Sequence, residues 1–253
     1  MDLGLSGHRV IVTGAGSGIG LAIAQAFRDE GADVWICDVS AEAVKASGFD
    51  GAVCDVSDRD AAADFVGAAC GALGGLDSLV NNAGIAGPTG PVEEIAGEDW
   101  DHCLNVCLTG QFNMTRAAVP HLRKSKNASI ANLSSLAGRV GFALRSPYAA
   151  AKWGVIGFTK SLSIELGPDK IRANAILPGL VAGERQERVL NAKAQRLGMS
   201  FAETEARAFS YTSIKDYVTP QQIADQIVFL ASQRGATISG QAISVCGDTQ
   251  MLA

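Results

Sequence analysis

The stretch Thr13-Gly14-Ala15-Gly16-Ser17-Gly18-Ile19-Gly20 decides how this chain folds. It sets four glycines between a short apolar run at residues 9–12 and a helix expected at residues 19–30. Glycine lets the backbone turn tightly, and the first N–H groups of a helix attract an anion. The stretch therefore predicts a strand, a turn and a helix whose junction holds a phosphate group.

The rest of the chain repeats this alternation of strand and helix. Strands are expected at residues 9–12, 33–37, 51–54, 78–80, 128–133, 172–177 and 241–245, and helices at residues 19–30, 58–73, 100–123, 147–166 and 219–232. The strands are short and apolar on both sides, which is typical of buried parallel strands. We expect an α/β fold in which a doubly wound parallel sheet carries helices on both faces, as a single domain over residues 1–253.

Composition narrows the classes of function. The chain has 253 residues, of which 47% are apolar, and a net charge of −5 with no basic run, so we expect no nucleic-acid partner. No apolar run is long enough to span a membrane, and no signal peptide is evident, so we expect a cytoplasmic protein. The six cysteines and three histidines show no metal-ligand spacing, and the cysteines are expected to be reduced.

A second informative stretch is Ser146-Pro147-Tyr148-Ala149-Ala150-Ala151-Lys152. Ser146 is interpreted as an N-cap and Pro147 as the first helical residue. Tyr148 and Lys152 are four residues apart, so they share one face of this helix. An ammonium group stabilises a nearby phenolate, and this would let a tyrosine act as a general acid and base.

Asp38 ends the second expected strand, 18 residues after Gly20. A carboxylate there can accept hydrogen bonds from both hydroxyls of an adenosine ribose, and it would repel a 2′-phosphate. No Arg or Lys lies within residues 13–20 or at Val39 and Ser40. The pattern favours NAD over NADP as cofactor.

Four motifs occur together in the order and spacing of one family. They are Thr13-Gly14-x-x-x-Gly18-x-Gly20, Asn81-Asn82-Ala83-Gly84, Tyr148-x-x-x-Lys152 and Pro178-Gly179. On these motifs the chain resembles the short-chain dehydrogenase/reductase family over nearly its whole length. The resemblance implies a Rossmann-type, three-layer αβα fold of about seven strands. It also implies hydride transfer between a nicotinamide and a carbinol or carbonyl carbon.

The resemblance assigns roles to individual residues. Tyr148 would be the acid and base, Lys152 would bind the nicotinamide ribose, and Ser135 would hydrogen-bond the substrate oxygen, while Ser134 would be structural. The cofactor would be held by Gly14, Ser17, Gly18, Ile19, Gly20, Asp38, Asp55, Val56, Asn81, Ala83, Gly84, Tyr148, Lys152, Pro178, Gly179 and Val181.

Two positions depart from the family pattern. Cys107, in Val106-Cys107-Leu108-Thr109-Gly110, stands where the family usually has an Asn that holds a water in a proton relay. Asn105 lies roughly 200° away around a regular helix, so it could replace that Asn only if the helix changes register. Either another group holds the water or turnover is slower, and a buried inert thiol is the simplest interpretation of Cys107. Gly183 stands where a Thr often binds the carboxamide.

Residues 183–217 interrupt the alternation and are charged and helix-prone, which predicts a lid over the substrate. Three arginines in or near the expected substrate segments, Arg139, Arg145 and Arg185, are candidates for binding an anionic group. They could equally be solvated or lie between subunits. Residues 148–166 are apolar or small on all faces, so this helix would pack on the sheet and on a second copy, giving a homo-oligomer, a dimer or tetramer.

The sequence thus predicts an NAD-dependent oxidoreductase acting on a small polar secondary alcohol or ketone, such as a sugar, a sugar acid or a hydroxy acid. One alternative is an NADPH-dependent 3-oxoacyl-thioester reductase, against which Asp38 argues. The other is an NAD-binding regulatory protein with little catalysis, against which the set of Ser135, Tyr148 and Lys152 argues.

Overall fold

A computed structural model describes residues 3–252; Met1, Asp2 and Ala253, at the ends of the expected domain, lie outside the described residues. The described residues form one parallel sheet of seven strands in the order β3-β2-β1-β4-β5-β6-β7. The strands are β1 (Arg9–Thr13), β2 (Asp33–Asp38), β3 (Asp50–Val53), β4 (Ser78–Asn81), β5 (Ser129–Leu133), β6 (Arg172–Pro178) and β7 (Ala242–Val245). The expected α/β class with a doubly wound parallel sheet is confirmed.

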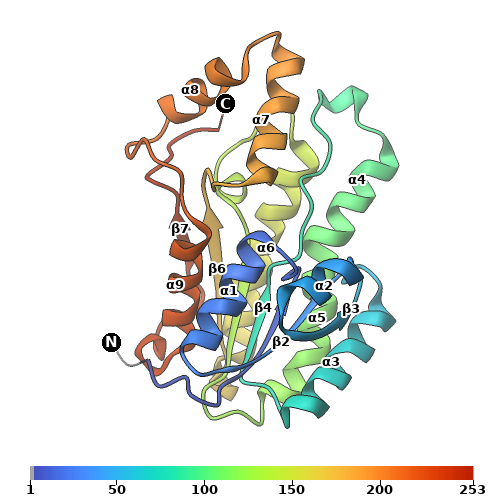
Figure 1. The fold of residues 1–253 in the computed structure, drawn as a ribbon, viewed down its shortest axis with the longest axis vertical. Coiled ribbons are helices and arrows are strands. Elements are labelled where there is room, and N and C mark those ends of the chain that lie inside the picture. Colours follow the sequence, from blue (N-terminus) through green and yellow to red (C-terminus); the bar gives the residue numbers. More distant parts are fainter. Residues whose placement is uncertain (1–2, 253) are drawn as a thin grey trace.

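Helices cover both faces of this sheet (Figure 1). On one face, α1 (Gly18–Asp29) packs against α9 (Pro220–Ala231), and on the other α3 (Arg59–Leu73) packs against α5 (Gly110–Leu122), with α6 (Ser146–Leu166) beside β6. Apolar side chains of each helix layer form a separate buried cluster with the strands. Further elements include α2 (Ala41–Ser47), α4 (Gly97–Leu104) and the 3₁₀ turns Val92–Glu94, Leu136–Gly138, Gly167–Asp169 and Gln233–Gly235.

The strand order reverses between β1 and β4, because the chain leaves β1 toward β2 on one side and later returns to β4 on the other. At such a point the connections after neighbouring strands run to opposite sides of the sheet and leave a crevice outside the carboxyl ends. The glycine-rich turn follows β1, and Asn82, Ala83 and Gly84 follow β4, so both lie at this crevice.

The helix expected at residues 100–123 is interrupted. A π-helical turn, η2 (Asn105–Thr109), separates α4 from α5. This widened turn changes the register of the helix, yet Asn105 remains exposed while Cys107 is fully buried. Asn105 therefore does not take over the position of the missing Asn.

The start of α6 also differs from the expectation by one residue. The helix begins at Ser146, and Arg145 is its N-cap residue, so Ser146 is not the cap. The Ser146 hydroxyl is buried and makes no hydrogen bond to a described residue. Pro147 still lies in the first turn, where a missing N–H costs nothing.

The segment 183–217 contains two helices, α7 (Glu184–Leu197) and α8 (Phe201–Ser210). In Figure 1 they lie at the top, above the carboxyl ends of the strands. The two ends of the segment lie side by side, because Val181 and Val218 form a parallel bridge and Val218 N donates to Leu180 O at 2.8 Å. Residues 183–217 therefore project from two hydrogen-bonded ends.

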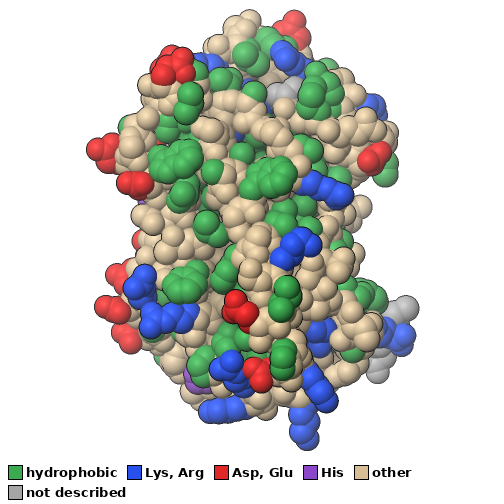
Figure 2. Space-filling model, turned by 180° about the vertical axis from the view of Figure 1, so that it is seen from behind, with side chains coloured by type: hydrophobic (Ala, Val, Ile, Leu, Met, Phe, Trp, Pro, Cys, Tyr) green, Lys and Arg blue, Asp and Glu red, His purple; other side chains and the backbone are tan. Residues whose placement is uncertain are grey.

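Apolar side chains are scattered over the middle of the face seen in Figure 2. Over the whole described surface the large exposed apolar side chains include Phe112 of α5 and Trp153 and Ile164 of α6. None of the helices within residues 3–252 combines the length and apolar composition that crossing a bilayer requires.

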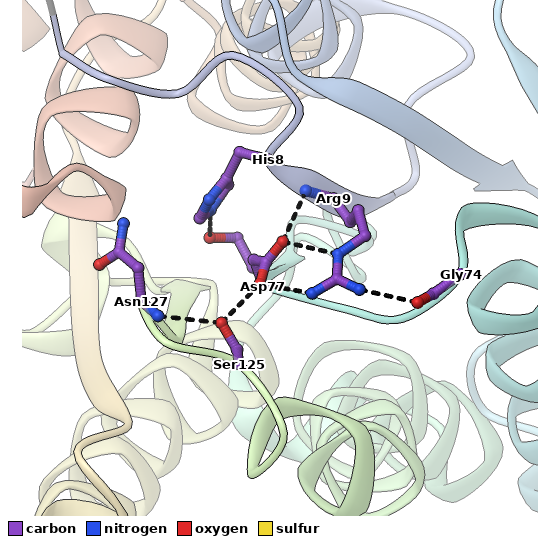
Figure 3. A network of polar contacts seen from close by, with 7 residues as sticks. His8, Arg9, Gly74, Asp77, Ser125 and Asn127 are labelled. Carbon is purple, nitrogen blue, oxygen red and sulfur yellow. Dashed lines mark hydrogen bonds and ion pairs between the residues drawn. The ribbon is translucent and has the colours of Figure 1, made fainter.

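A polar network ties the amino ends of the central strands together (Figure 3). Arg9, at the start of β1, donates through Nε and Nη2 to the two carboxylate oxygens of Asp77, both at 2.8 Å. Ser125 donates to the same carboxylate at 2.5 Å, and His8 shares a hydrogen bond of 2.7 Å with Ser78. This network lies at the end of the sheet opposite the crevice and holds β1, β4 and the approach to β5 in register.

Candidate active site

A cavity of about 710 Å³ lies at the crevice, between the carboxyl ends of the strands and the segment 183–217. Most of the residues predicted from the sequence line it. They are Gly14, Ser17, Gly18, Ile19, Gly20, Asp38, Asp55, Val56, Ala83, Gly84, Ser135, Arg145, Tyr148, Lys152, Pro178, Gly179, Val181 and Arg185. The fold thus brings residues from distant parts of the chain to one site. Asn81 and Arg139 are the two predicted residues that it does not place there.

The glycine-rich turn is shaped for close approach of another backbone. Gly14 has φ 59°, and a Cβ there would come within 2.8 Å of the Ala83 Cα. Gly18 also has positive φ, 57°, but no atom lies within 4 Å of its Cβ position. Ser17, at the N-cap of α1, makes no side-chain capping bond, so the first N–H groups of that helix remain available to an anion.

Asn82 holds this turn, a role that the sequence reasoning missed. Its side-chain amide donates to Thr13 O and Gly14 O, both at 2.9 Å, and the Thr13 hydroxyl accepts from Asn82 N and Ala83 N, both at 3.0 Å. Asn81 points the other way, as alternation along a strand requires. Its amide donates to Asn132 at 2.8 Å and to Thr115 at 3.0 Å, inside the protein. That same alternation indicates that Asn82 points away from the interior, but its bonds to the turn after β1 depend on β1 and β4 lying side by side.

Asp38 and Asp55 are held in fixed positions at one end of the cavity. Asp38 accepts from Gly16 N at 3.0 Å and from Ser40 N at 3.2 Å. Asp55 accepts from the backbone N–H and the hydroxyl of Ser57, at 2.9 and 2.7 Å. The cationic residues that line the cavity are Arg145, Lys152, Arg185 and Arg188, and none of them contacts either carboxylate.

Tyr148 and Lys152 lie together farther along the cavity. The Lys152 Nζ is 5.6 Å from the centre of the Tyr148 ring and donates to Leu133 O at 2.6 Å. Lys152 is only 3% exposed, so this ammonium is held inside the protein with one carbonyl acceptor and two remaining N–H donors. Tyr148, in the first turn of α6, also receives the positive end of the helix dipole.

The two serines after β5 behave differently, as expected. Ser134 is buried and donates to Lys152 O at 2.7 Å, which fixes the helix that carries the lysine. Ser135 is half-buried and lines the cavity; its oxygen accepts from Ala137 N at 3.1 Å. The hydroxyl hydrogen of Ser135 is therefore left to donate to an oxygen in the cavity.

Cys107 is fully buried beside the site. Its Sγ accepts from Ile85 N and donates to Ile85 O, each at 3.4 Å. A Cβ on Gly84 would lie 3.5 Å from this sulfur and 3.6 Å from Lys152 Nζ, so both groups border the same point. The hydrogen bond with Cys103, and to a smaller extent the charge of Lys152, lower the pKa of the Cys107 thiol against the effect of burial, and the same hydrogen bond raises the pKa of Cys103.

The three candidate arginines occupy different places. Arg145 and Arg185 line the cavity, with their guanidinium carbons 5.2 and 5.9 Å from the centre of the Tyr148 ring. Arg139 instead lines a second cavity, of about 800 Å³, and donates to the Ser244 hydroxyl at 3.4 Å. The structure therefore does not place Arg139 beside Tyr148.

Known proteins resemble this chain in sequence and in fold. The family model described as short chain dehydrogenase matches residues 8–194. The chain belongs to the short-chain dehydrogenase family. It is 38% identical to the 3-oxoacyl-acyl-carrier-protein reductase FabG of Thermotoga maritima, over 96% of this chain and 98% of that one.

Two solved structures of this family have nearly the same fold. An actinorhodin polyketide ketoreductase with NADPH aligns with TM-score 0.90 and 33% identity, over 95% of this chain and 96% of that one. An NAD⁺-bound xylitol dehydrogenase aligns with TM-score 0.92 and 26% identity, over 96% and 99%. Members of the family use nicotinamide cofactors, and these two differ in which one is bound.

The site in this chain fits such a cofactor. The turn at Gly14 leaves no room for a side chain, the N-terminus of α1 has unused N–H groups, and the cavity runs from Asp38 to Tyr148. Together these provide a cradle for a diphosphate, a carboxylate for a ribose and a cation for a second ribose.

Proposed function

We propose that this short-chain dehydrogenase is an NAD-dependent oxidoreductase that interconverts a small polar secondary alcohol and its ketone. One observation carries the proposal: a single cavity holds the Asp38 carboxylate in one part and Ser135, Tyr148 and Lys152 in another. When bound, the nicotinamide accepts hydride from the carbinol carbon or returns it to the carbonyl carbon. The residues of the chain supply proton transfer, alignment and charge.

Tyr148 is proposed to take the hydroxyl proton during oxidation and to return it during reduction. The buried Lys152 ammonium and the N-terminus of α6 would stabilise negative charge that develops on the Tyr148 oxygen in the transition state. Ser135 would donate its free hydroxyl hydrogen to the substrate oxygen and so hold that oxygen beside the phenol. Lys152 retains two N–H donors after its bond to Leu133 O, and these would bind the nicotinamide ribose.

The preference for NAD rests on Asp38. Its carboxylate is fixed by Gly16 and Ser40, and no cation of the cavity contacts it. A fixed negative charge favours two ribose hydroxyls and repels a 2′-phosphate. This argues against the NADPH-dependent thioester reductase.

A homo-oligomer and a cytoplasmic location complete the proposal. Trp153 is 53% exposed, Ile164 80% and Phe112 41%, so α5 and α6 present apolar side chains that a second copy could cover. All six cysteines, each within the described residues, are free thiols, which suits a reducing compartment.

The test is to measure the formation of NADH from NAD, or of NADPH from NADP, with polyols, hydroxy acids and cyclic alcohols as substrates. The native protein and Tyr148→Phe are compared. We expect NAD-dependent turnover that Tyr148→Phe reduces roughly 1000-fold or more while NADH affinity changes little. Tyr211→Phe is the control, because Tyr211 lies outside the cavity. NADH binding without turnover of any substrate would instead favour the regulatory protein.

A further inference from the structure

Arg145 is the largest fully buried side chain among the described residues, at 2% exposure. Its Nη2 donates to Ala86 O. Its Nε and Nη1 are buried and make no hydrogen bond to any residue between 3 and 252. At least three of the five N–H donors of the guanidinium, one on Nε and two on Nη1, are therefore unused. A buried charge that lacks a partner is costly, since neither water nor an acceptor compensates for it.

The backbone before Arg145 is strained, and that strain fixes where the arginine lies. Leu144 has φ 63°, a left-handed conformation that a leucine rarely adopts. Gly90 N donates to Leu144 O at 2.9 Å, and Ala149 N donates to Arg145 O at 2.9 Å, so the chain is held on both sides. Strain of this kind persists where the surrounding structure imposes it, and it is concentrated at functional sites.

No acidic side chain neutralises this arginine. The acidic residues that line the cavity are Asp38, Asp55 and Glu184. Asp38 and Asp55 accept hydrogen bonds from their own loops, as described above, in the part of the cavity assigned to the adenosine. Glu184 begins α7, and no ion pair joins it to a described residue. Arg185 and Lys193 both lie close enough to repel it. Within residues 3–252, the only groups that favour its charge are the phenol of Tyr148 and the thiols of Cys103 and Cys107, which are weak acids and not carboxylates.

Aromatic rings enclose the guanidinium on the side of the reacting centre. Its carbon is 5.2 Å from the centre of the Tyr148 ring and 5.3 Å from that of Phe142. Arg185, whose Nη1 donates to Gly84 O at 3.1 Å, lies 5.9 Å from the same Tyr148 ring. A group bound between these arginines would therefore lie within a few bonds of the oxygen that meets the Tyr148 hydroxyl.

Resting on the function proposed above, we propose that the substrate is a short hydroxy acid whose carboxylate binds to Arg145, with Arg185 nearby. The carboxylate would accept from Nη1 and from the second N–H of Nη2, supplying two of the acceptors that the guanidinium lacks. Because the Arg145 guanidinium carbon lies 5.2 Å from the centre of the Tyr148 ring, the carboxylate is attached to the carbinol carbon or close to it. A neutral alcohol would leave the arginine unpaired, so the site selects for charge.

The first experiment uses the native protein and pairs of compounds that differ in charge only. Short 2-hydroxy and 3-hydroxy acids are compared with their amides, with NAD as cofactor. We expect kcat/KM to be roughly 100-fold or more higher for an acid than for its amide. Sulfonate and phosphate analogues of the same length distinguish a carboxylate from other oxyanions. If neutral alcohols are oxidised well and the acids are not, the proposed function stands and this inference is overturned.

The second experiment replaces the arginine. Arg145→Met keeps much of the side-chain volume and removes the charge, and it should lower kcat/KM for the acids roughly 100-fold while changing that for amides by only a few-fold. Arg145→Lys should recover part of the loss. Arg139→Met, at the second cavity, is the matched control and should change neither. Equal losses for acids and amides would show that Arg145 only supports the loop at Ala86.

The third measurement does not depend on turnover. Short non-reactive carboxylates such as propionate, added with NADH, should raise the unfolding temperature of the native protein and of Arg139→Met, but not that of Arg145→Met. The neutral amides that correspond to these carboxylates should not raise the unfolding temperature. A carboxylate-dependent shift that persists in Arg145→Met would place the anion elsewhere and overturn the proposal. If Arg145→Met does not fold, Arg145→Lys and the native acid and amide pairs still decide.

Discussion

The thiol of Cys107 holds the backbone of Ile85 through both of its polar groups, accepting from the N–H and donating to the carbonyl at 3.4 Å. Ile85 follows Gly84 at the cavity, beside Lys152 Nζ. An asparagine side chain has one donor group and one acceptor, so it could make the same two bonds. The cysteine therefore holds the loop at Ile85, and an asparagine at this position could hold it in the same way.

Replacing Cys107 tests this explanation. Cys107→Val has a similar size but leaves the N–H and carbonyl of Ile85 unpaired, so we expect a loss of about 1–3 kcal/mol in stability and a lower kcat. Cys107→Asn should keep the fold and match or exceed the native kcat. The measurements are urea unfolding and steady-state kinetics. A valine variant with native stability and kcat would show that the thiol does not hold the loop.

Asp38 should determine the choice of coenzyme. Asp38→Ala removes the acceptor for the ribose hydroxyls and the charge that repels a 2′-phosphate, so kcat/KM should fall roughly tenfold with NAD and rise with NADP. Asp55→Ala is the control, since Asp55 is the other carboxylate at this end of the cavity and is not the proposed ribose acceptor, so its loss should weaken both coenzymes alike. Steady-state titrations with each coenzyme give the ratio. An unchanged ratio in Asp38→Ala would contradict the proposed NAD preference.

Gly183 should act as the flexible joint of the lid. It precedes α7 with φ 129°, a conformation that side chains rarely adopt, although no atom lies within 4 Å of its Cβ position. Gly183→Ala should therefore strain the backbone only, destabilising the protein by about 1–3 kcal/mol and raising KM. Gly198→Ala, at the other end of α7 with φ 65°, should cost stability without raising KM. A similar KM change in both variants would assign the effect to general loosening of α7.

The sequence was sufficient for the features that depend on local pattern. The alternation of apolar runs and helices predicted the sheet, and the spacing of Tyr148 from Lys152 predicted that they share one face of a helix. Both features follow from chain geometry at short range, so they need no knowledge of tertiary packing.

The features that depend on contacts between distant segments could not be predicted from the sequence alone. The π-helical turn at η2 gives no clear signal in the sequence, because it depends on how α4 and the turn itself pack against α6. Arg139 and Arg145 are only six residues apart, yet they line different cavities, because the connection after β5 turns between them. The role of Asn82 likewise depends on β1 and β4 lying side by side.

The amino-end network of Figure 3 should govern stability in acid. Burial lowers the pKa of His8 from 6.5 to about 4, so the unfolded chain takes up a proton in this range and the folded protein does not. Burial alone would raise the pKa of Asp77, but hydrogen bonds from Arg9 and Ser125 outweigh it and lower the pKa from 3.8 to about 2. For both residues, the contribution to folding stability is fully present above the pKa that the group has in the unfolded chain. It is lost as the pH falls toward the lower pKa of the folded protein.

His8→Gln should separate the two contributions. Glutamine keeps a polar group for Ser78 but takes up no proton, so the variant should lose less stability than the native protein as the pH falls from 6.5 to 4. The difference should reach about 3 kcal/mol at most, which corresponds to the lowering of the His8 pKa. Asp77→Asn should alter the pH dependence only below about 4, and it should cost stability at neutral pH because Arg9 loses its ion pair. Urea unfolding at pH 7, 5 and 4, and below pH 4 for Asp77→Asn, gives these values, and parallel curves for His8→Gln and the native protein would exclude His8 as the source of the acid sensitivity.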